Sequence, residues 1–355
     1  MKSAIKIKLL ALAAAAGLCA ATASAQQITV TSWGGAYTKS QVTAMHEPFT
    51  KATGVKILSE DYNGGLAEIR AQVKTGNVKW DVVDVELAEA LRGCDEGLFE
   101  KIDASKLPKG ADGSDAKADF LPGMVNDCAI ANISYANVVA YDKAKMGANA
   151  PTRLEDFFDL QKFPGKRGMK KEPNVNLEWA LMADGVAPAD VYKVLSTPAG
   201  VDRAFKKLDT IKSQIVWWSA GAQPPQLLAA GDVVMTSVFH GRIHAANTND
   251  KRNFAVLWDG QITVPDLFVV MKGSKNTKAA MDFVMFATGT KPLADQTKFI
   301  PYAPARKSSL ALVDAATKPW LPGPAQSGRG FQTNAGWWAD KADELNQRFA
   351  AWAAR

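Results

Sequence analysis

The chain has 355 residues, of which 47% are hydrophobic and 22% charged, a composition typical of a globular protein long enough for two domains. Its formal charge is +6, but three of its lysines lie in an N-terminal segment that we expect to be removed, which leaves a charge of about +3. This near balance, with no basic run interleaved with aromatic residues, argues against nucleic acid as a partner.

The N-terminal segment, residues 1–25, reads as a secretory signal peptide. Lys2, Lys6 and Lys8 form a positive region, an apolar run follows, and residues 23–25 form an A-x-A cleavage site. The apolar run is too short and too rich in alanine for a comfortable membrane span. We therefore expect an exported protein, and no later stretch is long and apolar enough to cross a bilayer.

Two cysteines remain after the signal peptide, Cys94 and Cys128. Exported proteins fold in an oxidising environment, so we predict that they form a disulfide. Two free thiols are the alternative.

The first predicted unit is a strand, a turn, a helix and a second strand, spanning residues 28–57. β-Branched residues dominate the first strand. Gly34 and Gly35 follow it and let the backbone turn with positive φ and approach a ligand closely. Ligands of open α/β sheets bind outside the carboxyl ends of the strands, and Trp33 stands at that edge. We interpret Trp33 as the first wall of a binding site; alternatively, it only caps the core.

The next buried strand is predicted at residues 80–85. Glu86 follows at its carboxyl end, which is again a position that faces a ligand. Residues 128–140 are β-like, and we place a crossing into a second domain at their end. Beyond it, Thr152 and Glu155 have the spacing of a capping box at a helix start.

Two adjacent tryptophans end a predicted strand at residues 215–219, where Trp217 and Trp218 precede Ser219. Successive side chains of a strand point to opposite faces. Only one of the two tryptophans can therefore face a cleft, and the pattern does not say which.

The strand predicted at residues 232–239 ends next to His240 and Arg242, which we expect at the cleft. Residues 254–258 form another predicted strand. An extended run at residues 262–271 then returns the chain to the first domain.

Strands and helices alternate along most of the chain, which indicates an α/β fold with mostly parallel sheets. We predict one lobe from residues 26–140 and 266–355 and a second lobe from residues 141–265. The two crossings between them would act as a hinge with a cleft.

An enzyme is the competing interpretation. His240 and His244 are four residues apart and could share one helix face as a metal pair, but no third ligand stands at a useful spacing. The chain has no G-x-S-x-G motif, no P-loop and no dinucleotide fingerprint. We expect no catalytic residues, metal or cofactor; a secreted hydrolase or metal-dependent enzyme on an α/β scaffold is the alternative.

Short motifs in a consistent order carry a family resemblance. They are SWGG at 32–35, FTKATGV at 49–55, WDVV at 80–83, WS at 218–219, GDVVM at 231–235, PDL at 265–267 and PYAP at 301–304. With them the chain resembles the periplasmic solute-binding proteins of ABC importers, in the spermidine/putrescine-binding group. The resemblance implies a two-lobed, type II Venus-flytrap fold, a small-molecule ligand, a permease in the inner membrane and a periplasmic location. We expect a monomer.

The resemblance also implies how an amine would bind. Acidic groups hold ammonium groups in polyamine-binding relatives, and by position Asp266 and Glu172 match such acids, while Trp33 matches an aromatic wall. Three other positions depart from the pattern: Val264 replaces a hinge aromatic, Val175 stands where another acid is expected, and Phe239 or His240 replaces a tryptophan. The site for a long polycation is therefore only partly present.

Arg242 suggests a more specific ligand. A guanidinium repels a polycation in a desolvated cleft, but it binds a carboxylate through two parallel hydrogen bonds. Arg242 and Asp266 would hold the two ends of a zwitterion, with Trp33 and one of Trp217 and Trp218 packed over its middle. We therefore hypothesise a polyamine or, more specifically, an ω-amino acid such as γ-aminobutyrate. The alternative for Arg242 is a surface salt bridge.

Overall fold

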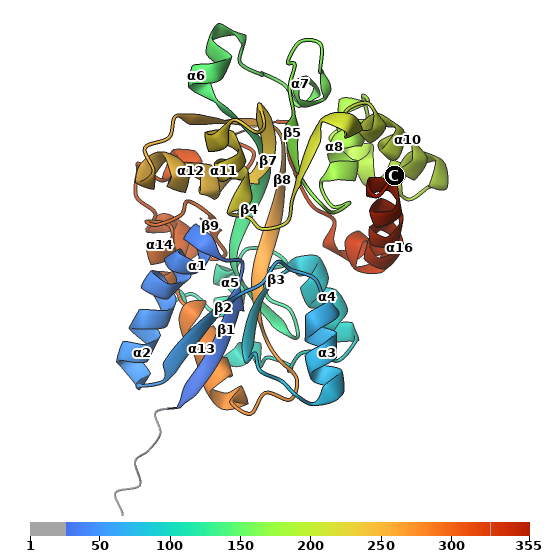
Figure 1. The fold of residues 1–355 in the computed structure, drawn as a ribbon. Coiled ribbons are helices and arrows are strands. Elements are labelled where there is room, and N and C mark those ends of the chain that lie inside the picture. Colours follow the sequence, from blue (N-terminus) through green and yellow to red (C-terminus); the bar gives the residue numbers. More distant parts are fainter. Residues whose placement is uncertain (1–25, 327) are drawn as a thin grey trace, which may run out of the picture.

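Two long strands run through both lobes of the molecule. The computed structural model describes residues 26–326 and 328–355, so the signal peptide predicted for residues 1–25 lies outside the described part. Strands β4 (Ala129–Asp142) and β8 (Phe254–Val270) pair antiparallel along the centre of the structure (Figure 1). The two predicted strands at residues 254–258 and 262–271 are therefore one strand, because both halves pair with β4.

A single sheet extends from one lobe into the other. In pairing order its strands are β2 (Lys56–Asp61), β1 (Gln27–Ser32), β3 (Val82–Glu86), β8, β4, β7 (Met235–Phe239), β5 (Arg167–Lys170) and β6 (Ile215–Trp218), and the short strands β9 (Ala303–Pro304) and β10 (Phe331–Gln332) pair with β4 and β8. Pairs on the two outer sides are parallel, whereas β3–β8, β4–β8 and β4–β7 are antiparallel. The sheet is thus mixed rather than mostly parallel, because the chain crosses between lobes in both directions.

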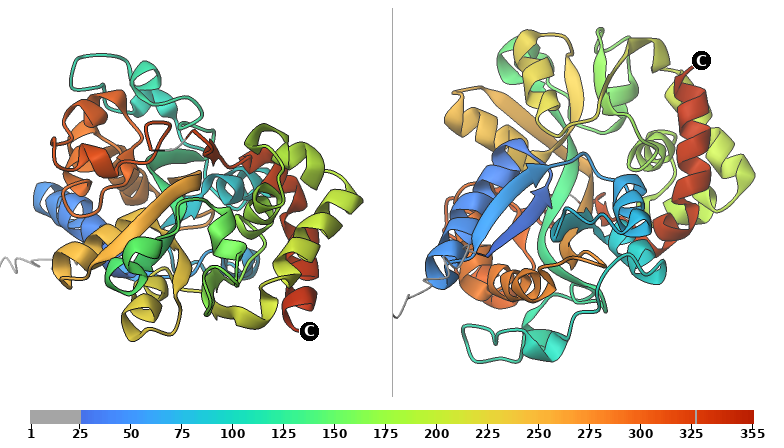
Figure 2. Two further views of the ribbon diagram at one scale, coloured as in Figure 1. Left: turned by 90° about the horizontal axis from the view of Figure 1, so that it is seen from above. Right: turned by 60° about the horizontal axis from the view of Figure 1, so that its bottom comes forward.

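Helices flank the sheet of the first lobe (Figures 1 and 2). They are α1 (Gly35–Gln41), α2 (Glu47–Thr53), α3 (Ala67–Thr75), α4 (Leu87–Asp95), α5 (Ala116–Asp119), α13 (Thr277–Ala287), α14 (Thr290–Gln296) and α15 (Lys307–Ala311), and a π-helical turn at Val42–His46 joins α1 to α2. Phe283 on α13 lies between Phe49 and Phe268, with ring centroids 5.4 and 5.7 Å away. These rings belong to a buried core of mostly aliphatic side chains, and burial of such apolar surface stabilises the lobe.

The second lobe contains its own group of helices. They are α6 (Lys143–Met146), α7 (Glu155–Phe158), α8 (Asn176–Ala183), α9 (Val191–Leu195), α10 (Pro198–Asp209), α11 (Gln223–Ala230) and α12 (His240–Asn249). Short 3₁₀ turns lie at Ala104–Lys106, Gly147–Asn149, Pro188–Asp190, Lys212–Gln214 and Lys318–Trp320. Every residue of α8 is buried, so this helix forms the centre of its core.

The last helix, α16 (Ala335–Ala353), packs against the second lobe beside α8 and α10 (Figure 1). Its buried Phe349 lies 5.5 Å from Trp217, and Trp338 donates a hydrogen bond of 2.7 Å to the buried carboxylate of Glu178 on α8. Residues 266–355 were predicted in the first lobe. The apolar stripe of α16 packs into the core of the second lobe, while Asp343 of α16 pairs with Arg92 on α4 of the first lobe, so the domain boundaries stay a prediction.

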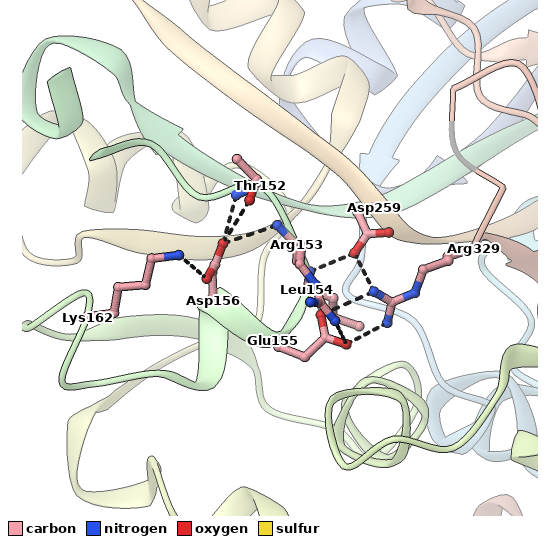
Figure 3. A network of polar contacts seen from close by, with 8 residues as sticks. All are labelled: Thr152, Arg153, Leu154, Glu155, Asp156, Lys162, Asp259 and Arg329. Carbon is pink, nitrogen blue, oxygen red and sulfur yellow. Dashed lines mark hydrogen bonds and ion pairs between the residues drawn. The ribbon is translucent and has the colours of Figure 1, made fainter. Parts of the chain in front are cut away.

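A polar network holds the segment that precedes α16 onto the second lobe (Figure 3). Arg329 binds Glu155 at 2.8 Å and Asp259 at 3.0 Å. Glu155 therefore does not close the predicted capping box. Asp156 takes that place and accepts a hydrogen bond of 2.8 Å from the backbone N–H of Thr152.

A disulfide joins Cys94 on α4 to Cys128 at the start of β4. The predicted pairing of the two cysteines is confirmed. In the part of the chain that the structure describes, no helix combines the length and the apolar character needed to cross a membrane.

The buried cores change along the crossing strands. In β4, Ala131 belongs to the core of the first lobe, Ile133 and Tyr135 to an aromatic cluster between the lobes, and Val138 to the core of the second. The change falls before the predicted crossing at residue 140. The aromatic cluster marks the place where the lobes meet.

Candidate binding site between the lobes

A small cavity lies where the lobes meet. It is lined by Trp33, Tyr37, Tyr135, Phe239, Arg242, Asp266 and Tyr302. These side chains come from both lobes and from the two crossing strands. The cavity measures about 10 Å³, which is close to the least space that holds one water molecule. The lobes are therefore closed onto each other.

Arg242 on α12 joins the two lobes directly. Its Nη1 donates to the carbonyl oxygen of Gly34 at 2.6 Å, and its Nη2 donates to that of Trp33 at 3.1 Å. Gly34 and Gly35 have φ of 72° and 59°, and a Cβ at Gly35 would lie 2.9 Å from Nη1. Trp33 and Gly34 thus present their backbone carbonyls to the guanidinium, and Gly35 leaves room for it.

Asp266 shares this cavity with Arg242. It is 3% exposed and lies on β8 opposite Glu86 of β3. Among the residues that the structure describes, Oδ1 of Asp266 and Nε of Arg242 have no hydrogen-bond partner. One hydrogen-bond acceptor and one donor are thus free in this cavity, as binding of an ammonium and a carboxylate would require. Their role as ligand contacts stays a prediction.

Five carboxyl groups gather around the cavity and form an acidic cluster: Asp84, Glu86, Glu89, Glu172 and Asp266. Burial raises the pKa of Asp84 and of Glu89 to about 7, and a neighbouring Glu86 adds to the shift at Glu89. Burial, followed by the charges of Asp84, Glu86 and Glu89, raises the pKa of Asp266 well above its usual range. Such a cluster is costly to ionise alone and favours a cation beside it.

Hydroxyl and amide groups hold parts of this cluster in place. Asp84 accepts hydrogen bonds from Tyr37 Oη at 2.9 Å and from Asn132 Nδ2 at 2.8 Å. Glu86 accepts one from Tyr135 Oη at 2.6 Å. The carboxylates therefore have fixed positions before any ligand arrives.

One lysine lies among these acids. Lys170, the last residue of β5, forms a 2.8 Å ion pair with Glu172, another predicted site residue. Its Nζ is 5.7 Å from the ring centroid of Trp33 and 5.6 Å from that of Phe239. The acids near the cavity are thus partly balanced by Lys170 and Arg242.

The two tryptophans of β6 face opposite ways, as their spacing requires. Trp218 is 2% exposed and packs on Phe239 in the cluster between the lobes, with centroids 5.6 Å apart. Trp217 packs on Phe349 and Trp352 of α16 instead. Trp217 is therefore part of the second lobe's core and not of the cleft.

Two further predicted residues have other tasks. Ser219 is exposed, and its backbone N–H binds Gln223 at 2.8 Å. His240 is fully buried; its Nδ1 accepts from the N–H of Ala136 at 3.1 Å, and its Nε2 lies 2.8 Å from the carbonyl oxygen of Pro301, to which it donates. Both ring nitrogens of His240 are thus used within the protein, and it serves as a structural bridge rather than as a ligand contact.

Sequence reasoning missed several residues at or near the cavity. They are Tyr37, Tyr135 and Tyr302, which line it, and Asp84, Glu89 and Lys170, whose charges act on Asp266. A signal existed for Asp84, which is two residues before Glu86 on one strand and so shares its face. Tyr135 carried no local signal, because only the pairing of β4 with β8 brings it to the cavity.

The chain is similar to known proteins over nearly its whole length. A family model described as "Bacterial extracellular solute-binding protein" matches residues 44–323. A γ-aminobutyric acid-binding protein of Pseudomonas aeruginosa is 44% identical over 337 residues, which cover 95% of this chain and 93% of that protein.

Two solved structures are also similar to this chain. One is the structure of the "Atu4243-GABA receptor", which is 36% identical to this chain. Its TM-score is 0.79, and the match covers 93% of this chain and 98% of that one. The binding protein MotA of A. tumefaciens B6, in complex with glucopine, is 29% identical with a TM-score of 0.85, covering 92% of this chain and 100% of that one.

Proposed function

This chain belongs to the bacterial extracellular solute-binding proteins, and we propose that it captures a zwitterionic ω-amino acid of the γ-aminobutyrate kind. As the solute-binding component of an ABC transporter, it carries a small molecule to a membrane permease. Its family and its relatives are binding proteins and not enzymes, so the alternative of a secreted hydrolase or metal-dependent enzyme is not favoured.

One observation carries the choice of ligand. A guanidinium (Arg242) and a carboxyl (Asp266) line the same cavity between the lobes, and the aromatic rings of Trp33 and Phe239 line it with them. A carboxylate suits the first group and an ammonium suits the second. The relatives named for γ-aminobutyrate binding support the same ligand class.

Capture requires the lobes to open and to close again. An amino acid is several times larger than the present cavity of about 10 Å³. Opening of the lobes would break the contacts of Arg242 with Gly34 and Trp33 and admit the ligand, and closure would form them again. A ligand that contacts both lobes favours the closed form, which the permease can then distinguish from the open one.

The proposal extends to the cell compartment. Residues 1–25 would direct export and be removed, and the mature chain would act in the periplasm as a monomer that meets its permease at the inner membrane. The disulfide between Cys94 and Cys128 suits such an oxidising compartment.

A titration series tests the ligand. Isothermal calorimetry would compare γ-aminobutyrate with putrescine, with butyrate, which lacks the amine, and with butylamine, which lacks the carboxylate. We expect γ-aminobutyrate to bind at micromolar or lower concentration, about 8 kcal/mol or more, and both truncated compounds at least a hundredfold more weakly. Binding of putrescine with no binding of any amino acid would refute the proposal.

A further inference from the structure

Lys170 carries a buried ammonium at the place where the two lobes meet. It ends β5 at the carboxyl edge of the second lobe's sheet, the edge at which ligands bind in α/β folds. Its side chain is 13% exposed. It reaches the space where Trp33 of the first lobe and Phe239 of the second approach each other.

The surroundings of the Lys170 ammonium are those that proteins use for amine ligands. Two aromatic rings, those of Trp33 and Phe239, lie within 6 Å of Nζ, at 5.7 and 5.6 Å, which is within the range of cation–π attraction. The carboxylate of Glu172 binds Nζ at 2.8 Å. Lys170 therefore occupies a cation site that the chain itself has built.

This ammonium stays charged despite its burial. Burial alone would lower the pKa of Lys170, but the charges of Glu172 and Glu86, the ion pair with Glu172, and the charge of Glu89 outweigh it and raise the pKa above its usual range. A second cation brought into the same space would meet a fixed positive charge where water is scarce, and like charges there repel strongly.

We propose that Lys170 is a specificity-determining residue that excludes diamines from the cleft. It fills one cation site with an ammonium of the protein, so that only the site at Asp266 remains for an amine of the ligand. Arg242 then accepts a carboxylate at the other end. Selectivity thus comes from a repulsive group as well as from attractive ones. This inference rests on the proposed function and names how its ligand class is chosen.

The test replaces Lys170 with methionine, which keeps the length of the side chain and removes its charge. Lys171→Met is the matched control, because Lys171 is the adjacent residue and is exposed. Calorimetry would measure γ-aminobutyrate and putrescine with each protein. We expect wild type and Lys171→Met to prefer γ-aminobutyrate by at least a hundredfold. We expect Lys170→Met to shift the ratio of the two dissociation constants toward putrescine by tenfold or more.

A second variant distinguishes a loss of selectivity from a loss of folding. Lys170→Met leaves Glu172 without its partner, so the double variant Lys170→Met/Glu172→Gln removes the stranded charge as well. The same shift toward putrescine is expected, because Glu86 and Glu89 remain beside the vacated position.

Each other outcome overturns the inference. An unchanged preference in both Lys170 variants refutes it and leaves the proposed function intact. Loss of γ-aminobutyrate binding with no gain of putrescine would mean that Lys170 holds the ligand's carboxylate. Wild type that binds putrescine as well as γ-aminobutyrate contradicts the exclusion directly, and wild type that binds neither compound refutes the proposed function together with it.

Discussion

Arg242 offers the sharpest test of how the lobes close. Arg242→Met keeps most of the side-chain volume and removes the hydrogen bonds to the carbonyl oxygens of Gly34 and Trp33. A hydrogen bond from a charged donor contributes on the order of 1.5 kcal/mol or more. The closed form should therefore lose about 3 kcal/mol relative to the open form, which by itself weakens the apparent affinity for γ-aminobutyrate about a hundredfold; loss of the contact with the ligand's carboxylate adds to this.

Two measurements separate lobe closure by the hydrogen bonds of Arg242 to Gly34 and Trp33 from recognition of the ligand's carboxylate. Small-angle scattering at saturating γ-aminobutyrate should show a compact wild type and a less compact Arg242→Met. Butylamine has no carboxylate, so in calorimetry its affinity for Arg242→Met should fall only through the lost hydrogen bonds between the lobes. The affinity for γ-aminobutyrate should fall further. Arg252→Met, at an exposed position beyond α12, is the control. An Arg242→Met protein that binds γ-aminobutyrate within threefold of wild type would refute the reasoning.

Three further predictions concern stability, pH and the aromatic wall. Replacing Cys94 and Cys128 by serine should cost about 4 kcal/mol of unfolding free energy in urea, because the disulfide closes a loop with a sequence separation of 34; a loss under 1 kcal/mol would contradict this. Burial raises the pKa of Glu178 from 4.5 to about 7; since its pKa is higher in the folded than in the unfolded protein, its contribution to stability is fully present below pH 4.5 and is lost as pH rises through 7. The difference in melting temperature between Glu178→Gln and wild type should therefore shift in favour of Glu178→Gln between pH 4.5 and 8, and an equal difference at both pH values would argue against it. Trp33→Leu should weaken γ-aminobutyrate binding about tenfold, through lost contact and cation–π attraction of about 1 kcal/mol, without changing the ranking of ligands in calorimetry; a changed ranking would show that Trp33 selects the ligand.

Local patterns were sufficient for much of the fold. The strand, glycine turn and helix at residues 28–57 were predictable because β-branched residues, two glycines and an apolar helix face each report on their own backbone. The disulfide followed from export and from there being two cysteines after the signal peptide. The alternation of strands and helices indicated an α/β fold, and a period of two showed that Trp217 and Trp218 point apart.

Long-range packing decided the rest. The apolar stripe of α16 indicates that this helix is buried but not against which core, and in the structure it packs with the core of the second lobe while Asp343 pairs with Arg92 of the first. His240 looked like a site residue until the folded chain brought Ala136 and Pro301 to its two ring nitrogens.

The charged residues of the cleft show most clearly what local sequence determines and what long-range packing decides. The sequence alone identified Trp33, Glu86 and Arg242 as candidates because each follows a predicted strand, and Asp266 through the family resemblance. Only the tertiary structure placed Lys170 between two aromatic rings. The physical reason is that a side chain's position along a strand is local, whereas the charge it faces depends on which distant strands pair beside it.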